Sequence, residues 1–144
     1  MKRTSLLLGL LLSASGTTAL SQAAPTGKPI EHVAWYQVMY VKFKPGMAEE
    51  ARKIIYEHFW AVDREIGREV IAFDPVTGEW DQVVYFPMPA GPSEVGLQST
   101  PWDAKWNAAF ERREGGKEKA DALNKRYGEM VQQTKIEIVM RRIS

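Results

Sequence analysis

The sequence predicts an α+β domain with the ferredoxin-like order β-α-β-β-α-β. Three observations support this prediction. An apolar strand pattern covers residues 33–43, an amphipathic helix pattern covers 47–66, and a hairpin pattern over 68–86 precedes a second helical region and a last strand. This order predicts an antiparallel four-stranded sheet with the helices on one face.

The first 23 residues have the pattern of a secretory signal peptide. A basic start precedes an apolar run over 6–12 that is too short to span a bilayer, and small residues lead up to Ala23. We expect cleavage after Ala23, so that the protein is exported and is periplasmic or secreted. Residues 24–32 then form a flexible lead-in. Residues 33–144 form a single domain, which has no membrane attachment after cleavage.

The charge balance and the lack of cysteine limit the functions and the sources of stability that the mature chain can have. Removing the leader takes away two basic residues and no acidic one, which leaves 17 basic and 18 acidic residues. This near-neutral balance gives no electrostatic reason to bind nucleic acid. The chain has no cysteine, so an exported domain of about 120 residues must be stabilised by packing, in which a second copy can take part.

The strand expected over 33–43 is apolar on both faces. Its side chains alternate between the faces, with Trp35, Gln37, Met39, Val41 and Phe43 on one and Tyr36, Val38, Tyr40 and Lys42 on the other. Because the helices of this fold cover one face of the sheet, the second face needs another cover. We therefore expect a homodimer that packs its two sheets face to face.

The helix expected over 47–66 ends at Gly67, since glycine commonly follows the last turn of a helix. A hairpin comes next, with strands over 68–73 and 79–86. Its turn is Asp74–Gly78, where proline starts the turn and glycine accepts the positive φ that ends it.

The second helical region is expected in two parts. A loop over 87–99, rich in proline and glycine, leads to Thr100, which can cap a helix together with the acidic residue three positions later. Gly115-Gly116 breaks the region. A further helix is expected over 117–132, and the last strand over 134–142.

The run Val41-Lys42-Phe43-Lys44-Pro45-Gly46 joins the first strand to an amphipathic helix. In this it resembles the dimeric α+β barrel superfamily, which includes stress-responsive A/B-barrel proteins and antibiotic-biosynthesis-monooxygenase-like domains. The resemblance covers about 33–142 and implies two sheets that close into a barrel across a homodimer, with a pocket between each sheet and its helices. Haem-degrading members carry a histidine on the second helical region, where this chain has none, so their residue roles are not carried over.

His58 is the candidate catalytic residue. The other histidine, His32, lies in the lead-in, whereas His58 falls roughly 60° from Ile55 on a helical wheel of about 100° per residue. This places its ring inside the apolar stripe that faces the sheet. His58 can be a hydrogen-bonded core residue, a pocket base or a haem ligand. The sequence predicts no other cofactor.

Five tryptophans and five tyrosines are many for a domain of this size. They can form a core, or they can form the wall of a pocket for a flat ligand. Gln37 and Gln82 lie within strands among apolar residues and need hydrogen-bond partners, either on a ligand or on each other across the dimer. The candidate ligand-binding residues are Trp35, Gln37, Trp80, Gln82 and Trp106.

The leading functional prediction is an exported homodimer that binds a small hydrophobic or aromatic molecule. Two alternatives stay open: an enzyme of the cofactor-independent monooxygenase type with His58 as base, and a non-catalytic structural or interaction protein. No metal site is predicted, because the chain has two histidines, no cysteine and no close spacing of histidine and carboxylate on one element. Whether the protein is an enzyme is not decided by its sequence.

Overall fold

A computed structural model describes Lys28 and residues 30–144 of the chain. The predicted signal peptide, residues 1–23, lies outside the described residues, as does most of the predicted lead-in over 24–32. Within the part of the chain that the structure describes, no helix is both long enough and apolar enough to cross a membrane.

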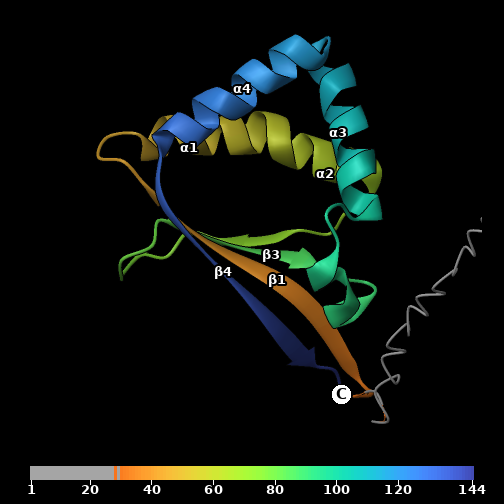
Figure 1. The fold of residues 1–144 in the computed structure, drawn as a ribbon. Coiled ribbons are helices and arrows are strands. Elements are labelled where there is room, and N and C mark those ends of the chain that lie inside the picture. The colour runs from red at the N-terminus through yellow and green to blue at the C-terminus, as the bar shows by residue number, and fades with distance from the viewer. Residues whose placement is uncertain (1–27, 29) are drawn as a thin grey trace, which may run out of the picture.

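Four strands form one antiparallel sheet in the order β2-β3-β1-β4. The long strand β1 (Val33–Phe43) pairs with both β3 (Gln82–Pro87) and β4 (Val131–Arg142), whereas β2 (Ile71–Phe73) pairs with β3. The helices lie on one face of this sheet (Figure 1). Element order, strand order and the one-sided helical layer are those of a ferredoxin-like α+β fold, so the predicted fold class is confirmed.

The first helical region contains one irregular turn. It comprises α1 (Ala48–Ile54), the π-helical turn η1 (Ile55–Phe59) and α2 (Trp60–Ile66), and it ends at Gly67 in the left-handed backbone conformation. The helix and its glycine end were predicted, but the π-helical turn was not. A π-helical turn holds more residues than an α-helical one, so it changes the direction in which nearby side chains such as His58 point.

The second helical region is divided as the sequence predicts. It consists of α3 (Pro101–Glu114) and α4 (Lys117–Met130), which are separated at Gly115-Gly116. The capping box is also present. The backbone N–H of Thr100 donates to the Asp103 carboxylate at 2.7 Å, and the Asp103 N–H donates to the Thr100 hydroxyl at 3.3 Å. These bonds fix the direction in which α3 leaves the preceding loop.

Three strands begin elsewhere than predicted. β3 begins at Gln82 rather than at Glu79, and it ends at Pro87. β2 begins at Ile71 rather than at Arg68, because the Arg68 N–H still donates to the Asp63 carbonyl, at 2.9 Å, in the turn that closes α2. β4 begins at Val131, three residues earlier than predicted, because an irregularity at the end of β1 lets Phe43 pair with Val131. The last helix correspondingly ends earlier than predicted.

The loop predicted over 87–99 contains a 3-10 helix, η2 (Gly91–Gly96). Local bonds between side chains and backbone close its first turn. The Ala90 N–H donates to the Glu94 carboxylate at 2.7 Å, and the Ser93 hydroxyl donates to the Ala90 carbonyl at 2.7 Å. Such bonds give short segments a regular shape that hydrophobic periodicity does not reveal.

Buried contacts between helices and sheet lie at one end of β1. There Val41 and Phe43 join a core with residues of α1, η1 and α4: Ala51, Ile54, Ile55 and Met130. A second core lies among the helices: Val62, Ala109, Phe110 and Ala120. At the other end of β1, η2 covers Trp35, and a Cβ on Gly91 would lie 3.1 Å from the Trp35 ring. Between these two ends the helical layer diverges from the sheet, as Figure 1 shows.

We expect the core among the helices to carry much of the stability. Phe110 is only 1% exposed, so Phe110→Ala should lower the free energy of unfolding by about 3–5 kcal/mol through lost transfer energy and a new cavity. Urea unfolding followed by far-ultraviolet circular dichroism measures this loss. The control is Val76→Ala at a side chain 97% exposed, which should change stability by less than about 0.5 kcal/mol. Equal stability of the two variants would contradict the assignment of the core.

Candidate functional site

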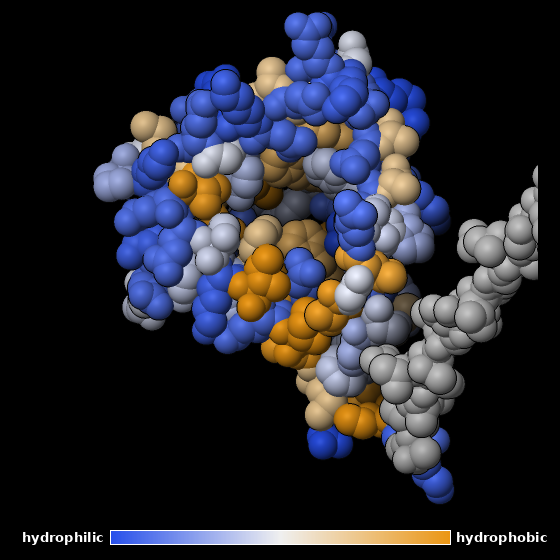
Figure 2. All heavy atoms as spheres, viewed as in Figure 1, coloured by the Kyte–Doolittle hydropathy of each residue, from blue (hydrophilic) through white to orange (hydrophobic). Residues whose placement is uncertain are grey.

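A cavity of about 360 Å³ lies where the helical layer diverges from the sheet. Its walls come from β1, β3 and β4, from the segment that contains η2, and from the start of α3. Figure 2 shows a hollow between the helices and the sheet, with apolar side chains gathered over β4 beside it. A cavity of this size is large enough for a small organic molecule.

The floor of the cavity is a row of residues across three strands. Gln37 of β1 pairs with Phe86 of β3 on one side and with Ile138 of β4 on the other. Residues that are directly opposite in an antiparallel sheet point to the same face, and all three line the cavity. Ile136 and Ile138 are both exposed, so the β4 end is an open apolar wall.

Arg68 lies at the other end of the cavity. It follows the glycine that ends α2, and its guanidinium carbon lies 4.7 Å from the centroid of the Phe86 ring. The side chain is 15% exposed, and Nη1 lies 3.9 Å from Asp63 Oδ1, which is too long for a hydrogen bond. Its Nε is buried without a hydrogen-bond partner. The guanidinium is therefore held by stacking and burial rather than by hydrogen bonds to Asp63.

Burial shifts the pKa values of Asp63 and Arg68 in opposite directions. It raises the pKa of Asp63 to about 6, although the Arg68 guanidinium and a hydrogen bond from Trp106 act the other way. It lowers the pKa of Arg68, against the attraction of Asp63, Asp103 and Glu94. Because arginine stays protonated in proteins, Asp63 is the member of the pair that loses its charge under mildly acidic conditions.

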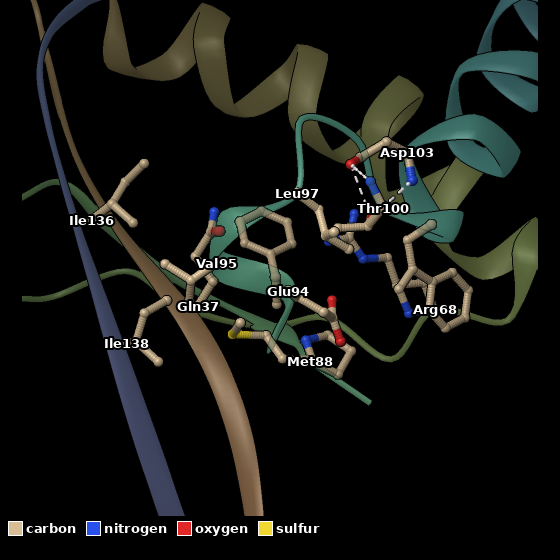
Figure 3. A pocket seen from close by; sticks show the side chains of 13 residues that line it. Gln37, Arg68, Met88, Glu94, Val95, Leu97, Thr100, Asp103, Ile136 and Ile138 are labelled. Atoms are coloured by element: carbon tan, nitrogen blue, oxygen red, sulfur yellow. Dashed lines mark hydrogen bonds between the residues drawn. The ribbon is translucent and has the colours of Figure 1, made fainter. Parts of the chain in front are cut away.

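Two further carboxylates, those of Glu94 and Asp103, line the Arg68 end of the cavity. Each is fixed by backbone donors. One oxygen of Glu94 accepts from the Ala90 N–H, and one oxygen of Asp103 accepts from the Thr100 N–H. Figure 3 shows these carboxylates and the Arg68 side chain on the same side of the cavity. Together with Asp63, three carboxylates act on one guanidinium.

The structure places three predicted residues in or near this region. Gln37 lines the cavity. Trp35 lies two residues away on the same face of β1 and lines two other pockets, one of which is bordered by η2. Trp106 packs in the core among the helices, with ring centroids 4.7 Å from Phe110 and 5.7 Å from Phe59. Of the three, only Gln37 borders the space that a ligand would fill.

Trp80 and Gln82 are not brought to the cavity. The Trp80 ring lies 5.7 Å from the ring of Tyr40, on the face of the sheet away from the helices. Gln82 is buried, and its amide donates to the Asp74 carboxylate at 3.5 Å. The partner that the sequence requires for Gln82 is therefore a side chain of its own hairpin.

His58 contacts α3 rather than the sheet that the helical wheel suggests. Its Nδ1 lies 2.8 Å from Glu114 Oε1, and the ring is partly exposed. The π-helical turn that contains His58 accounts for this direction. His58 is not among the residues that line the cavity, so its catalytic role stays a prediction. Among the described residues, no three His, Cys, Asp or Glu side chains are grouped to hold a metal ion.

Three residues that line the cavity were not predicted as site residues: Arg68, Phe86 and Glu94. Phe86 was expected within a strand but not at a site, because its face depends on the pairing register. Arg68 looked like an ordinary first residue of a strand. A weak signal was present: an arginine that directly follows a helix-ending glycine lies beside the end of the helix, where the chain turns back to the sheet. Only the fold places it over the Phe86 ring.

No family model matches the sequence, and no curated protein matches it significantly. Solved structures are similar in fold. A NIPSNAP family protein of unknown function from Agrobacterium tumefaciens strain C58 superposes with a TM-score of 0.52 and 11% identity, over 79% of this chain and 93% of that chain.

Two further solved structures have lower scores. Another NIPSNAP family protein from the same strain gives a TM-score of 0.45 and 16% identity, over 75% of this chain and 91% of that one. An uncharacterized NIPSNAP domain protein from Burkholderia xenovorans gives a TM-score of 0.45 and 11% identity, over 73% of this chain and 91% of that one. At these identities the likeness concerns the ferredoxin-like α+β fold alone. The resemblance to stress-responsive and monooxygenase-like domains stays a prediction.

We expect Asp63 to make stability depend on pH. Its pKa in the folded protein is about 6, above the ordinary value of about 3.9 in an unfolded chain. The folded state therefore holds more protons than the unfolded state between about pH 4 and pH 6, and the contribution of Asp63 to stability falls as pH rises through this window. In the wild type, Asp63 should lower the free energy of unfolding by roughly 2–3 kcal/mol as pH rises from about 4 to about 6. Asp63→Asn should remove this decline.

Urea unfolding of both proteins at a series of pH values measures the difference. Asp121→Asn, at an exposed carboxylate paired with Lys117, is the control and should leave the pH dependence of stability as it is in the wild type. Parallel curves for the wild type and Asp63→Asn would contradict the assignment to Asp63.

Proposed function

We propose that the protein binds a small, mainly apolar molecule in the cavity between its sheet and its helices. The observation that carries the proposal is the cavity of about 360 Å³, in which the apolar side chains of Ile136 and Ile138 lie opposite the charged side chains of Arg68, Glu94 and Asp103. Ligand sites in proteins commonly combine these features. A molecule that fills the space gains dispersion contacts that the lining side chains otherwise lack.

We further propose that the protein works as a homodimer. In it, each copy covers the face of the other copy's sheet that points away from the helices. Apolar and aromatic side chains lie on this face: Tyr36, Tyr40, Ile71, Phe73, Val83, Tyr85 and Val139. The charged residues Lys135, Glu137 and Arg141 of β4 border them on the same face. Phe73 is 57% exposed. The ring of Tyr85 lies 6.1 Å from that of Tyr36 and 5.9 Å from that of Phe73. An exposed apolar face of this kind marks a surface of association.

Export is proposed from the signal-peptide pattern of residues 1–23. A catalytic function is not part of the proposal, because His58, the base that the sequence predicts, pairs with Glu114 away from the cavity.

Substitutions at two neighbouring residues of β4 test ligand binding and dimer formation independently. Ile138 lines the cavity, whereas Val139 lines the opposite face of the sheet. We expect Ile138→Lys to weaken binding of the neutral fluorescent probe N-phenyl-1-naphthylamine by about tenfold or more, because the change puts a charge into the apolar wall. Val139→Lys, the matched control, should bind the probe as the wild type does. Absence of probe binding to the wild type would contradict the proposal.

The same pair of variants tests the homodimer. Light scattering at micromolar concentration should give twice the mass of the mature chain for the wild type and for Ile138→Lys. Val139→Lys should give a single chain, because lysine charges on both copies would repel each other within the interface. A wild-type protein with the mass of one chain would show that the second copy does not cover this face.

A further inference from the structure

We propose that the molecule in the cavity carries a neutral hydrogen-bond acceptor, the oxygen of a ketone, ester, amide or quinone, which accepts from Arg68. The inference rests on the proposed binding function and adds the chemical class of the ligand. It excludes carboxylates and phosphates, which are the usual partners of a buried arginine.

The need for an acceptor follows from the hydrogen bonding of Arg68. A guanidinium has five N–H donors and no acceptor. Here Nε is buried without a partner, and Nη1 lies 3.9 Å from the nearest oxygen of Asp63. One face of the group is covered by the Phe86 ring. Buried donors without partners are costly. Nε itself is enclosed, but the side chain is 15% exposed and lines the cavity, so an acceptor approaches its Nη groups there.

The preference for a neutral acceptor follows from the charges at this end. The carboxylates of Asp63, Glu94 and Asp103 all act electrostatically on the Arg68 guanidinium. Glu94 and Asp103 are fixed by backbone donors of η2 and α3, so they do not move away from the cavity. An anionic ligand would be attracted by one positive group and repelled by three negative ones. A carbonyl oxygen gains the hydrogen bond without that repulsion.

The length of the ligand follows from the row on the cavity floor. Ile138, Gln37 and Phe86 lie on three adjacent strands, which are about 4.8 Å apart, and Arg68 stacks over the last of them. In Figure 3, Ile138 and Arg68 lie at opposite sides of the cavity with Gln37 nearer the former. A body about 10 Å long, such as two fused rings, reaches from the apolar wall to the guanidinium.

Three probes of one shape test this inference. They are 2-ethylnaphthalene, which has no acceptor, 2-acetylnaphthalene, which has a ketone, and 2-naphthoate, which is an anion. Equilibrium dialysis at pH 7.5 gives a dissociation constant for each. We expect the ketone to bind about tenfold or more tightly than the hydrocarbon, as a hydrogen bond to a charged donor allows. The naphthoate should bind no more tightly than the hydrocarbon.

Two variants test whether Arg68 and Glu94 cause the preference for the ketone over the hydrocarbon and the anion. Arg68→Met should remove the advantage of the ketone and keep the binding of 2-ethylnaphthalene. Glu94→Gln, which leaves Arg68 in place and serves if Arg68→Met does not fold, should bind the naphthoate more tightly than the wild type and the ketone unchanged. Equal binding of ketone and hydrocarbon by the wild type would overturn the inference, as would tightest binding of the naphthoate. Failure of all three probes to bind would instead overturn the proposed function.

Discussion

The position at which the helices meet the sheet determines the remaining features of this domain. Val41 and Phe43, at one end of β1, join a buried core with α1, η1 and α4. Further along β1 the helices pack on one another in a core of their own, and the short helix η2 covers Trp35 at the far end. A two-layer domain that is closed at both ends and open between them leaves space over Gln37. The cavity is thus a consequence of the packing.

The groups that give this cavity its chemical character also have structural roles. Asp103 caps α3 through Thr100, and Glu94 closes the first turn before η2. Arg68 completes the turn that ends α2 through its backbone N–H. Their charged side chains converge on one end of the cavity because the segments they fix border it. Larger substitutions at these positions would therefore change local structure and the electrostatics of the site together, whereas Glu94→Gln removes the charge and keeps an oxygen that can accept from the Ala90 N–H.

Much of the fold could be predicted from the sequence, because its signals are local. The alternation of β1, the glycine that ends α2, the capping box at Thr100 and the break at Gly115-Gly116 each depend on a few neighbouring residues. The four-stranded antiparallel sheet with its helices on one face followed from the order of the elements.

The site could be predicted only in part, since it depends on register and on irregular turns. Gln37 was found because an amide within an apolar strand is unusual. The direction of His58 was wrong because the wheel assumes regular α-helical turns and η1 is a π-helical turn. Arg68 and Phe86 meet only through the pairing of β1 with β3 and the turn after α2. No sequence spacing encodes that contact.

Nuclear magnetic resonance of isoleucine methyl groups tests most directly whether the cavity is the binding site. Ile136 and Ile138 line the cavity, Ile71 lies on the opposite face of the sheet, and Ile54 is buried in the core. With 2-acetylnaphthalene added, we expect shift changes and intermolecular nuclear Overhauser effects at Ile136 and Ile138, and none at Ile54 or Ile71. Effects at Ile71 with none at Ile136 and Ile138 would contradict the assignment of the cavity as the binding site.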